Sequence, residues 1–481
     1  MGETTLKEKT SKGLFWGGIS GLLTQLLNAA FGIYLARTLT PEDYGLVGML
    51  AMFSLLATAM QDFGFPSALI NRKEIRHADY NAVFWFSLIV SVCCYALLFV
   101  SAPLIARYFH QPVLVGLSRV CFLPFIVAGL GIAHKTYLLK KLMIRELAMV
   151  NIVSVVIAGT VGVLLAAHGF AYWTLAIQPL VLNVCMTAGY WLFSHWRPTL
   201  HWDFRPIREM FPYSIWIWVT GILSIVNSNY LSVFLGRKYT AERVGYYTQA
   251  NKWSQMGTGV LISMVTNVAQ PVLASVTDEE ERQLRVFRKM LRFAAFVSFP
   301  CMFGLAFIAP EFIPIVITDK WNDSIQLLEI LCIGGAFTPL IYICSNLILS
   351  RGKSSIYMLN QITLFAMILL LLHLLYPKGI TAIVAGITMI NTLWLLVWAW
   401  LAHREIGYKL VHLFADLLPF LGIALVSIAG AWLLTCWIQI PWLLMAAKIV
   451  ATAAIYIFLM WITKSVTFRE SMQFILKRKV E

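Results

Sequence analysis

The sequence carries very little charge for its length. Only 12% of its 481 residues are Asp, Glu, Lys or Arg, whereas a soluble domain usually carries about 25%. A soluble chain of this length would form several domains, each with a charged surface. The shortage of charge therefore excludes an ordinary cytosolic enzyme, a disordered protein and a secreted disulfide scaffold.

Motifs for metal binding, redox chemistry and catalysis are also missing. The eight cysteines lie in apolar stretches and form neither a CxxC pair nor a Cys/His pattern. No Walker A loop, H-E-x-x-H motif or carboxylate pair is evident on a loop. Every loop is too short for a folded soluble domain. We therefore expect a protein that is not an enzyme and that holds no cofactor and no metal.

Long apolar runs dominate what is present, because 59% of the residues are hydrophobic. A bilayer core of about 30 Å is crossed by about 20 apolar residues in a helix. Runs of this kind predict an all-α polytopic membrane protein with about 14 transmembrane helices. The predicted spans are 14–36, 44–61, 82–106, 113–133, 147–167, 171–193, 211–235, 253–276, 293–317, 325–349, 356–376, 380–402, 414–437 and 442–463.

The basic residues are distributed unevenly among the loops. If the N-terminus is cytoplasmic, the cytoplasmic segments carry 27 of the 37 Lys and Arg residues and the outer segments carry 8. Such a bias follows the positive-inside rule. It predicts that both termini are cytoplasmic, and it accounts for most of the net charge of +14. Nucleic acid is therefore not an expected partner.

The chain contains an internal repeat at an offset of 200 residues. Both copies open a block of six predicted spans in the same orientation, which is typical of a parallel repeat in transporters. We expect an N-terminal lobe over 1–194, a cytoplasmic linker over 195–210, a C-terminal lobe over 211–402, and two additional helices with a basic tail over 403–481. The identical residues are Trp16, Gly21, Leu23, Leu35, Arg37, Thr40, Glu42 and Gly45, which recur as Trp216, Gly221, Leu223, Leu235, Arg237, Thr240, Glu242 and Gly245.

Polar side chains recur within the predicted spans. Ser20, Thr24 and Asn28 are spaced by four residues and share a helix face, and Thr220 and Ser224 repeat the pattern. Such a face either joins packed helices or lines a cavity between the lobes, and both interpretations stay open. The candidate cavity residues are Gln25, Asn28, Arg119, Asn227, Lys252, Gln255 and Asn267.

Several cations lie in or beside the spans. Arg119 falls inside the fourth span, where it faces a cavity or partner or extends to the interface. A basic link between the fourth and fifth spans either lies on anionic lipid headgroups or guides an anionic substrate. Arg37 and Arg237 end the first helix of each lobe, as an outer gate or as structural groups at helix C-termini. The residues of the basic link are Lys135, Lys140, Lys141 and Arg145.

We find no Asp or Glu well inside the predicted spans, with Asp62 and Asp416 standing at span edges. Proton- and sodium-coupled exporters commonly use an embedded carboxylate. Cations and amides suit an anionic or sugar-rich substrate instead. We therefore expect outward movement of an anion to be driven by the membrane potential, worth about 2.3 kcal/mol per charge per 100 mV.

The segment from Lys12 to Met49 resembles the N-terminal signature of polysaccharide-biosynthesis flippases of the Wzx-like, WzxC-like branch. That branch belongs to the multidrug/oligosaccharidyl-lipid/polysaccharide exporter superfamily. The core of the resemblance is Leu35-Ala36-Arg37 followed by Thr40-Pro41-Glu42-Asp43-Tyr44-Gly45. The later stretches QDFGFPSALINRKE (61–74) and YLLKKLMIRELA (137–148) are also similar.

The resemblance implies two six-helix lobes around a central cavity, often with two added helices. It further implies that an undecaprenyl-diphosphate-linked oligosaccharide moves from the inner to the outer leaflet of a bacterial inner membrane for surface polysaccharide synthesis. Anionic lipids, a polysaccharide polymerase and a chain-length protein are candidate partners. The alternatives are a drug or peptidoglycan-precursor exporter, a membrane-embedded glycan polymerase or ligase, and a structural scaffold.

Overall fold

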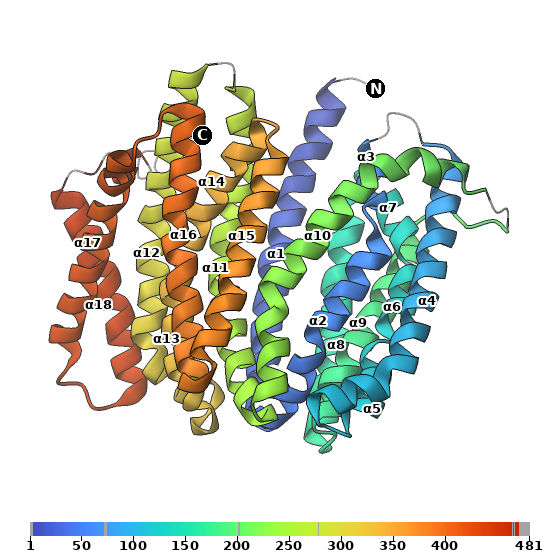
Figure 1. The fold of residues 1–481 in the computed structure, drawn as a ribbon, viewed down its shortest axis with the longest axis horizontal. Coiled ribbons are helices and arrows are strands. Elements are labelled where there is room, and N and C mark those ends of the chain that lie inside the picture. The colour runs from blue at the N-terminus through green and yellow to red at the C-terminus, as the bar shows by residue number, and fades with distance from the viewer. Residues whose placement is uncertain are drawn as a thin grey trace. The chain divides into compact units, whose positions relative to one another are not determined.

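The computed structural model describes residues 3–71, 75–200, 203–277, 279–463, 465 and 467–470. Within these residues all regular secondary structure is helical, in eighteen α-helices and two 3-10 helices (Figure 1). The prediction of an all-α protein is therefore confirmed. The chain divides into two compact units, Met1–Thr248 and Gln249–Glu481, which are called unit 1 and unit 2 below.

Unit 1 contains the first ten helices and the first residues of α11 (Ala241–Ser275). Within it α1 packs along α8, α8 along α9 and α2 along α10. The predicted lobe boundaries differ from these units and stay a prediction. The helices are α1 (Glu3–Thr38), α2 (Pro41–Asp62), α3 (Phe65–Asn71), α4 (His77–Phe109), α5 (Leu114–Cys121), α6 (Pro124–Gly129), α7 (Ile132–Lys140), α8 (Ile144–Ala167), α9 (Tyr172–Phe193) and α10 (Arg205–Lys238).

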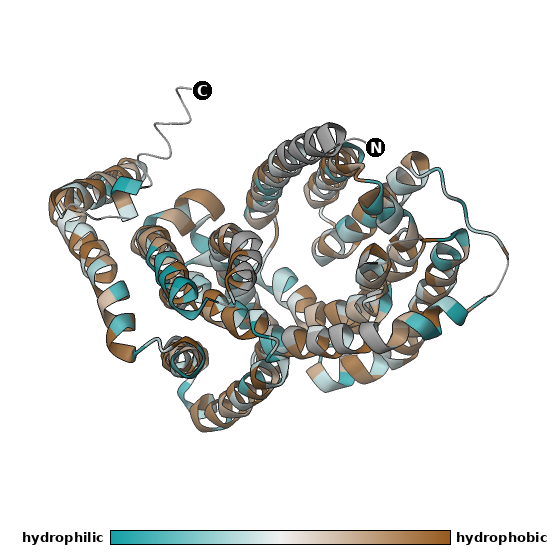
Figure 2. Cartoon of the chain, turned by 90° about the horizontal axis from the view of Figure 1, so that it is seen from above, coloured by the Kyte–Doolittle hydropathy of each residue, from teal (hydrophilic) through white to brown (hydrophobic). Residues whose placement is uncertain are grey.

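Unit 2 is arranged around its longest helix, α12, which packs against α13, α14, α17 and α18. Hydrophobic residues cover long stretches of the helices (brown in Figure 2). The two predicted additional helices are α17 and α18, and they pack on each other as well as on α12. The elements are α12 (Glu280–Ile317), η1 (Asp319–Trp321), α13 (Asp323–Gly335), α14 (Thr338–Ser350), α15 (Ser354–Leu375), η2 (Tyr376–Lys378), α16 (Ile380–Ile406), α17 (Leu410–Thr435) and α18 (Pro441–Ile462).

The number of membrane spans is supported only in part. Ten helical segments of the described chain are long and apolar enough to cross a bilayer, and the bent set α5–α7 makes eleven. The fourteen predicted segments lie largely in helical structure. The helices α1, α10 and α11 are not among the ten, and each of them contains side chains outside the described residues. These three helices contain most of the predicted cavity residues. The count of fourteen stays a prediction.

The fourth predicted span is broken rather than continuous. It is divided into α5, α6 and α7, with a bend of 44° between the segment Leu114–Gly129 and α7. A break frees backbone carbonyls, which need donors inside a membrane. Side chains of α2 and α9 supply them, so the break is held by neighbouring helices. The donors and carbonyls pair as Gln61 with Phe125, Thr187 with Val127 and Trp191 with Leu130.

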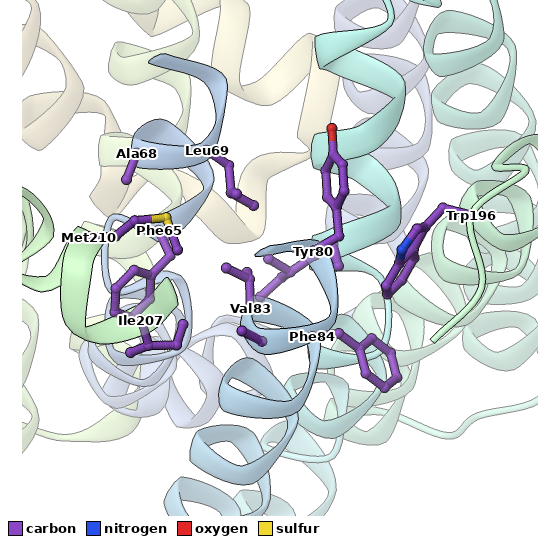
Figure 3. Packing of buried hydrophobic residues seen from close by; sticks show 12 residues of the cluster. Phe65, Ala68, Leu69, Tyr80, Val83, Phe84, Trp196, Ile207 and Met210 are labelled. Carbon is purple, nitrogen blue, oxygen red and sulfur yellow. The ribbon is translucent and has the colours of Figure 1, made fainter. Parts of the chain in front are cut away.

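A buried apolar cluster fixes one end of unit 1. It joins α3, α4, α7, α10 and the segment after α9, and Figure 3 shows nine of its members with labels. Phe65 and Val83 are fully buried there, and Trp196 closes the cluster beside Tyr80 and Phe84. The predicted linker 195–210 thus contributes three core residues, Trp196, Ile207 and Met210, and the chain is helical again from Arg205.

Candidate functional site

The polar face of α1 is shared between two environments. Thr24 accepts a hydrogen bond from Asn151 Nδ2 of α8 at 3.0 Å, as expected for polar contacts between packed helices. Gln25 is half-buried and Asn28 is exposed within unit 1. The part of the face at Thr24 therefore joins helices. Gln25 and Asn28 have no hydrogen-bond partner among the described side chains, and their role as cavity residues stays a prediction.

The matching face of α10 is described less completely. Asn227 is half-buried. Asn229, two residues on, donates to the carbonyl of Ile225 in its own helix at 3.0 Å. The side chains of Thr220 and Ser224, which complete the repeated pattern, lie outside the described part of the chain.

The predicted cavity residues of α11 lie in unit 2. Lys252 is half-buried and already engaged with another group. Gln255 is exposed and lies one turn from Asn251, with Nε2 3.4 Å from Oδ1. Asn267 is in the helix, but its side chain lies outside the described residues. Lys252 and Gln255 thus lie within three residues of each other near the start of the predicted span.

The Arg119 guanidinium lies over an aromatic ring and forms no ion pair with the described side chains. It lies near the end of α5, and its guanidinium carbon is 4.2 Å from the centre of the Phe99 ring of α4. Tyr95 Oη also donates to the Arg119 carbonyl at 3.3 Å. The Nε of Arg119 is buried and has no hydrogen-bond partner among the described residues. A cation–π contact partly offsets the cost of placing this cation away from water.

The basic link places three exposed cations at the end of unit 1 that is predicted to be cytoplasmic. Lys135 is exposed, and Lys141 and Arg145 extend over the rings of Tyr137 and Trp16 at 5.9 and 5.6 Å. These three cations face no carboxylate among the described side chains. Their charge is therefore available to an anion, whether that anion is a substrate or a lipid headgroup.

Lys140, the fourth cation of the basic link, has a different environment. It is half-buried, and its Nζ donates to the carbonyl of Ile70 in α3 at 2.7 Å. This contact joins the end of α7 to α3. Lys140 is therefore a positioning residue for the link as well as a charge.

Arg37 and Arg237 have different surroundings, although the repeat makes them equivalent. Arg237 contacts the His110 imidazole, and its guanidinium carbon lies 5.3 Å from the centre of the Tyr108 ring. Both partners belong to the end of α4. Arg37 is exposed and is engaged with another group. The structure thus gives Arg237 a structural contact in unit 1, and a gating role stays a prediction for both arginines.

The two copies of the repeat meet inside unit 1 at a glycine that both copies contain. A Cβ on Gly45 would overlap the Ala241 carbonyl, and a Cβ on Gly245 would overlap the Pro41 carbonyl. Since Ala241 is the repeat equivalent of Pro41, the contact is reciprocal. The starts of α2 and α11 cross here with backbone against backbone. Thr40 fixes the approach, because it forms a capping box with Asp43 at the start of α2.

One sequence expectation is wrong: an acid does lie inside a predicted span. Glu311 of α12 pairs with Lys448 of α18 at 2.7 Å, and their side chains are only 12% and 10% exposed. Both residues fall within predicted spans, so two opposite charges in apolar runs were the available signal. The predicted spans therefore do contain an acidic residue. The argument for transport driven by the membrane potential alone was based on its absence and no longer holds.

A second missed cluster lies at the other end of α12. Asp416 of α17 is fully buried and accepts hydrogen bonds from Arg288 and Arg292 at 2.7 to 2.9 Å. Tyr408 donates to the same carboxylate at 3.2 Å. The sequence placed Asp416 at a span edge and did not indicate these partners. The structure instead makes Asp416 the centre of the contact between α17 and α12.

Comparison with known proteins agrees with this architecture. Residues 34–326 match the family model described as polysaccharide biosynthesis protein. The lipopolysaccharide biosynthesis protein WzxC of Escherichia coli (strain K12) is 25% identical over 358 residues, which are 73% of this chain and 72% of WzxC. The teichuronic acid biosynthesis protein TuaB of Bacillus subtilis (strain 168) is 25% identical over 407 residues, which are 82% and 83% of the two chains.

Two further similarities extend the comparison. The succinoglycan biosynthesis transport protein ExoT of Rhizobium meliloti (strain 1021) is 23% identical over 346 residues, 72% of this chain and 69% of ExoT. The inward closed structure of the lipid II flippase MurJ superposes with a TM-score of 0.75 at 12% identity, over 95% of this chain and 99% of MurJ. The resemblance predicted from the sequence is confirmed, and the chain is a multi-span membrane protein that belongs to the polysaccharide biosynthesis protein family and has a MurJ-like fold.

Proposed function

We propose that this protein is a flippase for an undecaprenyl-diphosphate-linked oligosaccharide, which it moves from the inner to the outer leaflet of a bacterial inner membrane. The family match over residues 34–326 carries the proposal. Its relatives are named for biosynthesis or transport of lipopolysaccharide, teichuronic acid and succinoglycan. In this role the protein moves its substrate by alternating access and is not an enzyme.

The charges of unit 1 suit the diphosphate of such a substrate. Phosphate oxygens accept strong, charge-assisted hydrogen bonds from Lys and Arg. Lys135, Lys141 and Arg145 are exposed at one end of unit 1 and face no carboxylate among the described side chains. We assign them to the first contact with the lipid-linked diphosphate on the cytoplasmic side, where they also contact anionic lipids.

The amides suit the glycan. An oligosaccharide presents many hydroxyl groups, which both donate and accept hydrogen bonds, and Asn and Gln side chains can do the same. The proposed glycan contacts are Gln25, Asn28, Asn227 and Gln255. They lie on α1, α10 and α11, within the predicted spans of these helices. Polar side chains within membrane helices usually face the interior of the helix bundle or a water-filled cavity.

Deletion of the gene tests the flippase function directly. We expect the complete lipid-linked oligosaccharide to accumulate in the inner leaflet, as measured by its protection from a membrane-impermeant glycosidase or lectin added outside. Truncated glycans would instead indicate a membrane enzyme. Accumulation of peptidoglycan precursor, or drug sensitivity with normal surface polysaccharide, would indicate another exporter of the superfamily.

Reconstitution of the purified protein tests whether it acts alone. Vesicles that contain the chain and a fluorescent lipid-linked oligosaccharide are expected to expose the glycan to an outside quencher faster than empty vesicles. A variant with Lys135, Lys141 and Arg145 changed to Ala is the control, and we expect it to transport more slowly than the wild type. Equal rates of glycan exposure in vesicles with and without the protein would overturn the proposed activity.

A further inference from the structure

An ion pair inside unit 2 is enclosed by the helices that form it. The Lys448 ammonium of α18 is 2.7 Å from Glu311 Oε1 and 3.4 Å from the Phe307 carbonyl oxygen, both on α12. Its Nζ also lies 4.4 Å from the centre of the Phe307 ring. Only 10% of the Lys448 side chain is exposed. The cation therefore belongs to the contact between α12 and α18 and is not a solvated surface group.

The pair lies well inside its helices. Lys448 is seven residues after Pro441, where α18 begins, and Glu311 is six residues before Ile317, where α12 ends. At about 1.5 Å per residue, both charges are about 10 Å from the predicted outer ends of the helices. Ionisable groups at such depth are costly, and apolar residues would pack these helices at least as well. Their presence indicates a function beyond packing.

A second carboxylate accompanies the pair. Glu329 of α13 is half-buried and interacts electrostatically with both Glu311 and Lys448. With all three groups ionised, two negative charges face one positive charge. One excess negative charge remains in a poorly hydrated region. One added proton makes the group neutral, and carboxylates that share a site characteristically hold a proton between them.

Glu311 offers a place for that proton. Its Oε1 is occupied by Lys448, whereas Oε2 is buried and has no hydrogen-bond partner among the described residues. A buried oxygen without a donor is unfavourable as a carboxylate and less so as a protonated acid. The buried Oε2 without a partner and the excess negative charge are separate observations, and both indicate that the site binds a proton.

Few other titratable groups surround this site in the described chain. Cys332 of α13 interacts with Glu329. The remaining charged residues of α12, α16 and α17 lie toward the opposite ends of those helices, and α14 has none. At the predicted outer end of α12, the neighbouring groups are Asp319 and Lys320 of η1, Asp323 of α13 and Cys436 after α17.

We propose that Glu311, Glu329 and Lys448 form a binding site for one proton, which is taken up from the predicted outer side of the membrane. Uptake converts one carboxylate and a proton from water into a carboxylic acid, so no further reactant is needed. In the flippase this site supplies the coupling ion, a step that rests on the proposed function. The site itself does not depend on which substrate the protein carries.

Infrared difference spectroscopy of the full-length protein tests the site without any transport. As the pH is lowered, we expect a carboxylic acid C=O band that is lost in E311Q and in E329Q. The matched control is E281Q, because Glu281 is paired with Arg285 on an exposed surface, where its side chain is 93% exposed. A band that is absent from the wild type, or unchanged in both cluster variants, would overturn the site.

Misfolding of the single variants is controlled by removing all three charges together. In E311M/K448M/E329Q the buried pair becomes apolar side chains of similar length, a change that is commonly neutral for stability, and the second carboxylate becomes an amide. This variant is expected to fold and to lack the band. If it folds and keeps the band at full size, the proton is bound elsewhere and the proposal fails.

Transport assays in vesicles test the coupling. One bound proton allows at most about a tenfold change in rate per pH unit, and we expect acid on the predicted outer side to stimulate the wild type toward that limit. E311M/K448M/E329Q should lose the dependence. A wild-type rate unaffected by the gradient would overturn the coupling role. Normal infrared bands with no transport by the wild type would leave the proton site standing and reject the flippase function.

Discussion

The two units place their cations in opposite environments. In unit 1, Lys135, Arg145 and Arg119 are exposed or lie against aromatic rings, without a carboxylate among the described side chains. In unit 2, the cations of α12 and α18 are matched by Asp416 and Glu311. The two units therefore use charge differently. Unit 1 keeps cations available for an anionic ligand, whereas unit 2 neutralises them and uses them to hold helices together.

The strongest test of this contrast is to break a neutralised site in unit 2. Asp416→Asn leaves Arg288 and Arg292 without their carboxylate at a fully buried position. Removal of one partner of a buried ion pair typically costs about 3–5 kcal/mol, and the partial exposure of both arginines favours the lower end. We expect this loss in the free energy of unfolding, measured by denaturant titration in detergent.

Glu281→Gln provides the control for that measurement. Glu281 and Arg285 form an exposed pair, with side chains 93% and 72% exposed. Pairs of this kind contribute about 0–1 kcal/mol. If Asp416→Asn lowers the free energy of unfolding no more than Glu281→Gln does, the Asp416 cluster does not hold α17 on α12. The cations of unit 2 would then have no structural role that distinguishes them from those of unit 1.

The second test removes available cations from unit 1. The triple change of Lys135, Lys141 and Arg145 to Ala should leave the fold intact, because these side chains are exposed. Cations near a charged lipid surface contribute about 1 kcal/mol each. We therefore expect up to about a hundredfold weaker binding of a lipid-linked diphosphate, measured by titration with fluorescent substrate, and a smaller effect at high salt.

The matched variant for this test lies in unit 2. Arg282 and Arg285 are already paired with Glu279 and Glu281, so the change of both arginines to Gln removes two positive charges that are not free. Substrate affinity should fall much less than in the unit 1 variant. Equal losses in the two variants would mean that net charge alone attracts the substrate and that the position of the cations is unimportant.

The sequence was sufficient for most of the fold because membrane helices are specified by local composition. The predicted apolar segments lie largely in helical structure, and the repeat already contained Gly45 and Gly245, but the sequence did not indicate that these glycines meet. The pairing of Glu311 with Lys448 was not predictable in this way. It joins positions 137 residues apart, and only the packing of α18 on α12 brings them together.

The candidate site was predicted with similar limits. The basic link was identified from its charge, but the sequence did not separate Lys140, which bonds the Ile70 carbonyl, from its exposed neighbours. The bend in the fourth span was also missed, although Pro124, Gly129 and Gly131 mark it. Residue types indicated where polar chemistry is present. The partner of each polar group depended on contacts between helices.

The third prediction concerns the glycine corner, where the two copies of the repeat contact each other directly. Gly245→Ala places a methyl group on the Pro41 carbonyl oxygen, a backbone atom that cannot move as a side chain does. Forcing atoms into a closely packed site usually costs about 1–3 kcal/mol. We expect a corresponding loss in thermal stability, measured by fluorescence-detected unfolding. Gly221→Ala is the control, because its added Cβ would meet nothing within 4 Å, and a similar loss there would show that the corner is not specially tight.

The smallest expected effect separates the two roles of the polar face of α1. Thr24 and Asn151 form a hydrogen bond between helices, and such bonds in membrane proteins contribute about 0.6 kcal/mol on average. A double-mutant cycle with T24V and N151A should give a coupling energy of this size and leave transport unchanged. Gln25→Ala and Asn28→Ala should have the reverse pattern, with normal stability and slower glycan transport, because their amides remain for another partner. If T24V slows transport as much as Q25A, the face acts as one surface, and the separation between helix contact and substrate contact drawn from the structure is wrong.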